Sequence, residues 1–203
     1  MEKTSNLTKK LVIAISSIVV CVMLIGVVVY AALSQNVNLS NTITVTTGGQ
    51  AKSIVTVYEQ VITGNTAVTA LPATEPTWGD AILTKDENTD SANKDLTPIE
   101  FSYSNGKNIY AYKIVVQNKS TGTVKIAISS STESNTEVDV YCGETYATAT
   151  KLDNTKGVNF EETGVATDGE VTYYIFVCSN TALESMTAAT AQDFDIDIVV
   201  TAE

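Results

Sequence analysis

Apolar and polar residues alternate along most of the chain after residue 35. In the first such segment, 36–47, the apolar residues at every second position share one face, and only Asn41 interrupts that face. Successive side chains of a β-strand point to opposite faces, so each alternating segment predicts a strand. Further strands are predicted at 53–62, 99–103, 109–117, 124–130, 137–142, 147–152, 171–178 and 193–201.

Turn-forming residues bound most of these segments. The pair Asn105-Gly106 stands between two of them and is a strong hairpin signal. The segment 63–95 contains two prolines and a polar run, so it is interpreted as a long loop or an insertion that Trp78 pins to the domain. Residues 179–187 predict one or two helical turns. Eight or nine short strands separated by turns predict an all-β fold, a jelly-roll-like antiparallel β-sandwich.

The chain begins with a different pattern, because three lysines among the first ten residues precede an uncharged apolar run at 11–33. Such a run is long enough to span a bilayer as one hydrophobic helix, with its basic end inside the cell. Cleavage between Ala31 and Ala32 would make residues 1–31 a signal peptide. Retention would make them a single-pass anchor that attaches the chain to the membrane. Both interpretations predict that residues 32–203 form a secreted or cell-surface domain.

The composition narrows the possible functions. The chain contains no His and no Arg, and its formal net charge is −11. An acidic chain without Arg is a poor match for nucleic acid, so we expect no nucleic-acid partner. The lack of His excludes His-based triads and zinc sites of the HExxH type. No GxSxG nucleophile motif is present either. We therefore expect a protein that is not an enzyme and that has no organic cofactor.

Two cysteines, Cys142 and Cys178, follow the apolar segment. Each ends a predicted strand, on the face that carries apolar residues. A disulfide between them would close a loop of about 36 residues and contribute on the order of 3–4 kcal/mol. Two buried free thiols are the alternative.

Two groups of acidic residues are candidates for calcium. Asp86, Asn88 and Asp90 have the spacing of the first three ligands of a calcium loop, although Gly at the sixth position and Glu at the twelfth are missing. Period-two spacing also places Asp193, Asp195 and Asp197 on one strand face. A solvated loop and a solvated strand face are the alternatives.

The two ends of the chain and one internal segment resemble a known family. A basic start, an apolar run ending in Tyr-Ala-Ala-Leu-Ser and a closely following alternating strand (NVNLSNTITV) are similar to secreted proteins with SipW-type signal peptides, such as the TasA and camelysin biofilm-matrix proteins. The segment 109–128 and the closing FDIDIVVTAE also resemble that family. The resemblance implies a jelly-roll domain that assembles into extracellular fibres, in some members by donating the N-terminal strand to the next subunit.

These observations lead to two hypotheses. In the first, the chain is an exported structural or adhesive protein of the cell surface, in which residues 32–47 exchange between subunits of a fibre or pair within their own domain. If the strand is exchanged, removal of 32–47 should leave a folded domain unable to polymerise, whereas wholesale unfolding would favour pairing within the domain. In the second, the chain is a membrane-anchored binding module for carbohydrate or a host protein. Its exposed platform would consist of tyrosines, namely Tyr103, Tyr110, Tyr112, Tyr141, Tyr146, Tyr173 and Tyr174. The alternative is that these residues pack in the core or across strands, and the face that Tyr110 and Tyr112 share with Ile114 and Val116 favours the core.

Overall fold

A computed structural model describes residues 20, 36–96, 98–130, 137–152, 157–186 and 192–203. The apolar run 11–33, apart from Val20, and the predicted cleavage site at Ala31 and Ala32 lie outside the described residues. Among the residues that are described, no helix is long and apolar enough to cross a membrane.

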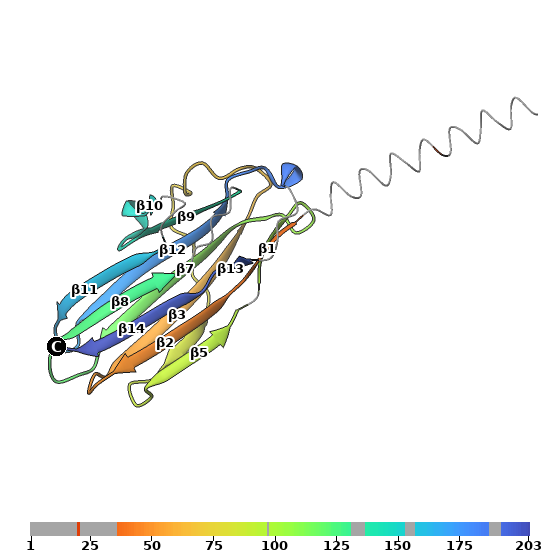
Figure 1. The fold of residues 1–203 in the computed structure, drawn as a ribbon. Helices are drawn as coiled ribbons and strands as arrows, with labels where there is room; N and C mark the ends of the chain where they lie inside the picture. The colour runs from red at the N-terminus through yellow and green to blue at the C-terminus, as the bar shows by residue number, and fades with distance from the viewer. Residues whose placement is uncertain (1–19, 21–35, 97, 131–136, 153–156, 187–191) are drawn as a thin grey trace, which may run out of the picture.

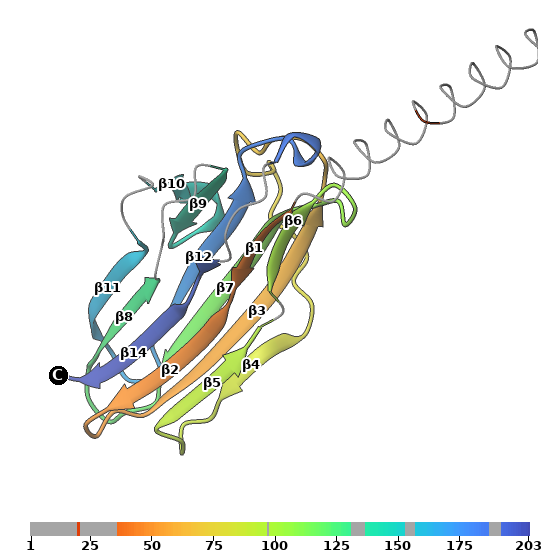
Figure 2. The same ribbon diagram turned by 45° about the vertical axis from the view of Figure 1, so that its right-hand side comes forward.

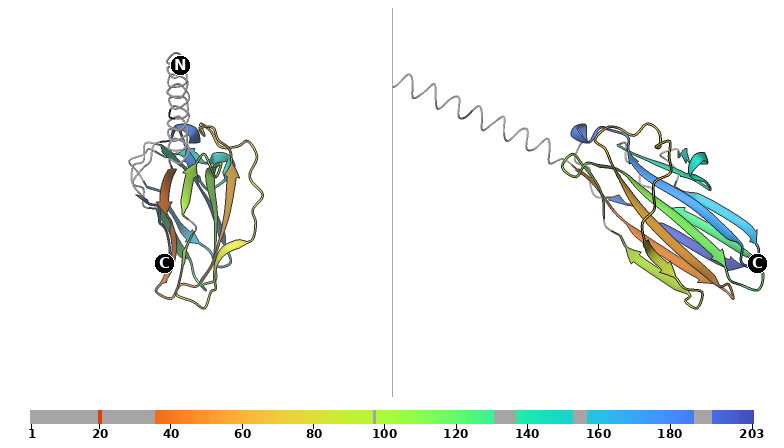
Figure 3. Two further views of the ribbon diagram at one scale, coloured as in Figure 1. Left: turned by 90° about the vertical axis from the view of Figure 1, so that its right-hand side faces the viewer. Right: turned by 180° about the vertical axis from the view of Figure 1, so that it is seen from behind.

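The strands form a sandwich of two sheets, and Figures 1 and 3 show its two layers. The spatial order of the six-stranded sheet is β10 (Thr150–Lys151), β9 (Val138–Gly143), β12 (Glu170–Ser179), β7 (Lys107–Asn118), β3 (Ser53–Thr63) and β4 (Ala81–Lys85). The order of the five-stranded sheet is β11 (Asn159–Val165), β8 (Val124–Ser130), β14 (Ile196–Ala202), β2 (Thr42–Gly48) and β5 (Ser91–Asp95). The predicted all-β sandwich is confirmed.

In the layer that contains the five-stranded sheet, three strands are each interrupted at the same point along the length of the sandwich. A short three-stranded sheet, in the order β13 (Gln192–Asp193), β1 (Asn36–Ser40) and β6 (Ile99–Ser102), lies beyond the interruption. In Figure 2, β1 follows the line of β2. Two hydrogen bonds cross the interruption: the Leu96 amide donates to the Asn41 carbonyl at 2.8 Å, and the Thr42 amide donates to Asp195 Oδ1 at 3.2 Å.

The first described strand of the chain lies inside its layer and not at an edge. On one side β2 pairs in parallel with β14, where Ile43 lies opposite Ile196. On the other side it pairs antiparallel with β5. β1 repeats this arrangement between β13 and β6. All the other pairings of the described strands are antiparallel, so the sandwich departs from a purely antiparallel one where its first and last strands meet.

The main core fills the space between the two layers, and a smaller apolar cluster covers the outer face of the six-stranded sheet. β12 contributes to both, as expected for a strand that is apolar on both faces. The ring of Trp78 lies 6.1 Å from that of Tyr174, so the loop before β4 is pinned to the sheet as predicted.

The structure corrects two local predictions and refines a third. The segment 63–95 contains β4 and β5, whereas a loop or an insertion was expected. Most of the strand expected at 147–152 is replaced by a 3-10 turn at Tyr146–Thr148 and the two-residue β10. The helical turn expected at 179–187 is a 3-10 turn at Leu183–Ser185.

Candidate functional site

The first candidate site is the first strand and the slot that it fills. The name first strand denotes residues 36–48, and the slot is the space between β13–β14 on one side and β5–β6 on the other. Leu39, Ile43 and Val45 point into the core, where they are 5%, 0% and 0% exposed. Because main-chain hydrogen bonds run to neighbours on both sides, the first strand completes a sheet that would otherwise be divided in two.

A buried polar chain anchors the first strand at its interruption. Asn41 is 3% exposed, and its Nδ2 donates to the Tyr112 hydroxyl. The Tyr112 hydroxyl in turn donates to Glu59 Oε1 at 3.4 Å. Asn41 Oδ1 is buried and has no hydrogen-bond partner among the described residues. This polar residue on an otherwise apolar face is the residue that the sequence pattern singled out, and it stands where the strand is interrupted.

Glu59 gives the anchor a dependence on pH. Burial raises the pKa of Glu59 above its usual 4.5, although Tyr112, Lys107 and Lys94 act in the opposite direction; Tyr110 also lies near this carboxyl. The folded protein therefore holds the proton better than the unfolded chain does, and stability is lost as the pH rises through the raised pKa. We expect Glu59→Gln to stabilise the fold more at pH 7 than at pH 4. Urea unfolding of both proteins at each pH measures the difference, and an equal effect at both values would contradict it.

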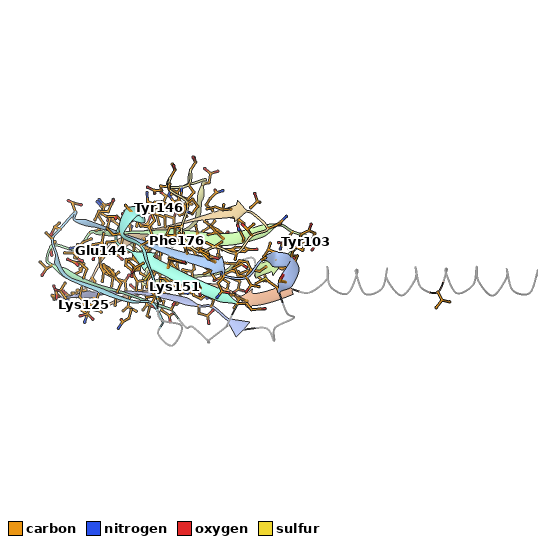
Figure 4. The ribbon with its side chains drawn as sticks, turned by 90° about the horizontal axis from the view of Figure 1, so that it is seen from above. Tyr103, Lys125, Glu144, Tyr146, Lys151 and Phe176 are labelled. Atoms are coloured by element: carbon orange, nitrogen blue, oxygen red, sulfur yellow. The ribbon has the colours of Figure 1, made fainter. Side chains whose placement is uncertain are left out.

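A short hinge joins the first strand to the next strand. The hinge consists of residues 49–52 and carries the chain from β2 in one layer to β3 in the other. Gly49 has φ +69°, which favours glycine. The Lys52 carbonyl accepts a 2.8 Å hydrogen bond from the Lys119 amide. We call this end of the sandwich the hinge end; Lys125, in β8, lies toward it, and Tyr103 lies at the opposite end (Figure 4).

The second candidate site is a groove at the open side of the sandwich, where β9–β10 and β11 are the edges of the two sheets. It consists of two adjoining cavities of about 400 Å³ and 280 Å³ that share Glu144, Thr145 and Phe160. In Figure 4, Glu144 lies over this side of the molecule. The remaining lining residues are Cys142, Gly143, Thr148, Thr150, Glu162, Glu170, Val171, Thr172 and Tyr173.

The groove combines an aromatic floor with polar walls. The ring centroids of Phe160 and Tyr173 lie 4.4 Å apart, and each residue is less than a tenth exposed. Burial raises the pKa of the Cys142 thiol, so this thiol is a poor nucleophile. Threonine hydroxyls and glutamate carboxylates supply donors and acceptors around the floor, an arrangement that suits a hydroxyl-rich ligand.

The predicted disulfide does not form. Cys142 lies opposite Ile175, and Cys178 lies opposite Asp139 on the neighbouring strand. This register places the two cysteines three positions apart, so their side chains point to opposite faces of the sheet. Both thiols are buried and free, and burial raises the pKa of Cys178 as well. The alternative of two free thiols is therefore the correct one.

The calcium candidates fall in two places. Asp86 Oδ1 accepts hydrogen bonds from the Asn88 amide and from Asn88 Nδ2, both at 3.0 Å, and Asp90 follows in the same turn between β4 and β5. Asp195 Oδ1 binds the Thr42 amide across the interruption of the strand, and Asp197 is exposed on β14. The side chain of Asp193 lies outside those described. Calcium binding at either place stays a prediction.

The predicted platform of exposed tyrosines is wrong. Tyr110, Tyr112, Tyr141, Tyr173 and Tyr174 are all buried. Of the remaining two tyrosines in that set, Tyr146 is half-buried and Tyr103 is 39% exposed at the end opposite the hinge. The buried rings pack in the two apolar clusters instead, where they stabilise the sandwich.

Comparison with known proteins leaves the family open. No family model matches the chain, and no curated protein matches it. The carbohydrate-binding module TmCBM61, solved with β-1,4-galactotriose, is 7% identical with a TM-score of 0.24; the match covers 51% of this chain and 75% of that one. The yeast delta-COP-I mu-homology domain is 8% identical with a TM-score of 0.24, over 84% and 97% of the two chains.

A third similar structure is the shaft pilin spaA from Lactobacillus rhamnosus GG. It is 9% identical, with a TM-score of 0.24, and the match covers 77% of this chain and 97% of that chain. Scores this low carry no argument about the function of this chain.

Proposed function

We propose that this chain is an exported structural or adhesive protein of the cell surface that associates with copies of itself by exchanging its first strand. The observation that carries the proposal is the interior position of that strand, which has a neighbouring strand on each side. It is the first strand of the domain, it is joined to the rest by a hinge of four residues, and it completes the sheet through main-chain hydrogen bonds on both sides. An identical strand from a second copy would make the same contacts in the slot.

The sequence adds the cellular setting to this proposal. The basic start and the apolar run at 11–33 support export, with residues 1–31 either removed or kept as an anchor. A jelly-roll-like order is the finer form of the fold that we propose. It rests on the connections, most of which cross from one sheet to the other. The resemblance to fibre-forming matrix proteins supports self-association.

A disulfide across β2 and β14 should stop the exchange. Thr46 and Val199 lie opposite each other in the parallel pair, and both are exposed. Paired strand residues are within the Cα separation that a disulfide needs. In T46C/V199C oxidised as a dilute monomer, we expect the first strand to be locked in its own slot, so that assembly at high concentration falls at least tenfold. Light scattering and electron microscopy measure the assembly.

The reduced form of the same variant is the matched control, because it differs only by the bond and should assemble like the unmodified protein. A second control, T46C alone, separates the lock from the effect of a surface thiol. If the locked monomer assembles as readily as the reduced one, strand exchange is not the route of association.

The groove supports a second candidate function, the binding of a neutral oligosaccharide. Its threonine hydroxyls and glutamate carboxylates surround an aromatic floor, as described above. A glycan array with the exported protein should then identify a bound oligosaccharide. The double variant E144A/T150V should weaken that binding at least tenfold, because each substitution removes a polar group from the wall of the groove. Thr163→Val is the control, since that exposed β11 residue does not line the groove. An array without any hit would remove this candidate.

A further inference from the structure

The position of the hinge decides how two copies can share their first strands. β2 ends at Gly48 and β3 begins at Ser53, and both residues lie at the hinge end. The first strand therefore has residue 48 at the hinge end and residue 36 at the opposite end of whichever slot it fills. The hinge must join the hinge end of the filled slot to the hinge end of the strand's own domain.

The hinge is too short for an open head-to-tail fibre. From residue 48 to residue 53 the chain can span about 18 Å at most when fully extended. The first strand itself is about 43 Å long at 3.3 Å per residue. In a head-to-tail arrangement, the hinge end of one domain meets the opposite end of the next, so the hinge would have to run along the whole sandwich. Its reach is less than half of that length.

A side-by-side polymer meets a second obstacle. It would require the six-stranded sheet of one copy to lie flat against the slot of its neighbour, because β3 follows the hinge in that sheet. The outer face of this sheet is occupied by residues of the segment before β4, including Val68, Leu71 and Trp78, which pack on Tyr174 and Phe176. This covering keeps a neighbouring sheet from close approach.

We infer that the partner of the first strand is a second copy in a closed, reciprocal pair, with the two hinge ends facing each other. In this arrangement the hinge opens and β2 continues toward β3 of its own domain across the interface. The partner's first strand reaches back in the same way, so the pair is symmetric and both slots are filled. The inference rests on the proposed strand exchange and specifies which assembly that exchange produces.

The charges at the hinge end set a condition for this pair. The connections and strand ends there carry six acidic side chains, namely Asp86, Glu87, Asp90, Asp168, Glu170 and Glu203, against the three lysines Lys52, Lys85 and Lys119. Lys125, which lies toward this end, is paired with Glu161 at 2.6 Å, so acidic groups remain in excess. Two acidic ends repel each other at low salt, and salt screens that repulsion. The reciprocal pair should therefore form more readily in 0.5 M than in 0.05 M sodium chloride.

Shortening the hinge in the full exported protein tests the inference. Deletion of Gly49–Ala51 leaves two Cα steps between Gly48 and Ser53, about 7.6 Å, whereas the layers of a sandwich are about 10 Å apart. The closed monomer can then no longer form, but β2 can run straight into β3 across the paired hinge ends. The deletion variant also carries T46C/V199C, so that a disulfide forms between the first strand and the slot that it fills. A disulfide between two chains survives denaturation and shows that the strand came from the other copy.

The expected result is a particle of twice the monomer mass by light scattering and one covalent dimer on a non-reducing gel. Insertion of three residues at the same place is the control and should give a monomer with an intrachain bond. A ladder of covalent oligomers would overturn the closed pair but leave strand exchange standing. A folded monomer with only intrachain bonds would overturn the exchange and the pair together.

The deletion variant could fail to fold, so a second measurement uses the unaltered hinge. T46C/V199C is unfolded and then refolded at high protein concentration before oxidation. Covalent dimers without larger species support the reciprocal pair. A ladder contradicts the pair, and intrachain bonds alone contradict both the pair and the exchange.

Discussion

A chain that lacks residues 32–47 should fail to fold, and a peptide of residues 36–48 should restore its structure. The first strand buries Leu39, Ile43 and Val45, and each such side chain contributes about 1.5–3 kcal/mol. Hydrogen bonds on both sides of the strand are lost as well. This loss is comparable with the whole stability of a domain, about 5–15 kcal/mol. Circular dichroism and urea unfolding with and without the peptide measure the result.

From sequence, a folded domain was expected after removal of 32–47 if the strand is exchanged, and unfolding if it pairs within its own domain; the structure favours unfolding. The reason is that the strand lies between the last strand and β5, and not at an edge. A chain beginning at Asn36 is the matched control and should fold normally. A peptide in which Ile43 is replaced by Asp should not rescue the truncated chain. A truncated chain that folds alone with unchanged stability would contradict the central role of the strand.

Asn118→Ala should cost about 3 kcal/mol of stability. Asn118 is fully buried at the hinge end. Its Nδ2 donates to the carbonyls of Gly122 and Val165 at 2.9 and 2.8 Å, and its Oδ1 accepts from the Ser120 amide at 2.7 Å. Alanine removes these bonds and leaves buried main-chain groups without partners, at about 1–3 kcal/mol each before relaxation. The melting temperature should fall by about 6–12 °C.

Asn93→Ala is the matched control for this substitution. Asn93 is exposed on the edge strand β5, so its replacement should change stability by less than about 0.5 kcal/mol. Calorimetry on the three proteins measures both effects. Equal, small changes for the two substitutions would show that Asn118 does not hold the connections at the hinge end together.

The sequence predicted the strands that have one buried face. The expected segments 53–62, 109–117 and 124–130 correspond to β3, β7 and β8 within two residues at each end. The period-two pattern of β3 and β8 arises because one face packs in the core and the other does not. In β7 this pattern holds only from residue 113 on, because residues 108–112 are buried on both faces. The sequence also indicated where the first strand is interrupted, because Asn41 is the one polar residue on its apolar face. Pairing partners had no such signal, because alternation does not say which strand lies beside which.

The strands that escaped prediction are β4, β5 and β11, which all lie at sheet edges. β5 reads SANKD and has only one residue that is not exposed, so no apolar period marks it. β11 reads NFEETGV, with buried residues only at Phe160 and Val165, and a register shift separates them. The groove was missed for the same reason, since it is formed by edges that come together only in the folded chain.

The parallel pair of the first and last strands also has a kinetic consequence. The hydrogen bond between Thr42 and Asp195 joins residues 153 positions apart, so the ladder between the first and last strands cannot form until almost the whole domain is available. Contacts of such separation slow folding. A chain that leaves the cell in an extended form would therefore keep its first strand unpaired throughout passage. In that interval the strand would be free to meet another chain, and under the proposed exchange the local concentration at the exit site would decide which slot it fills.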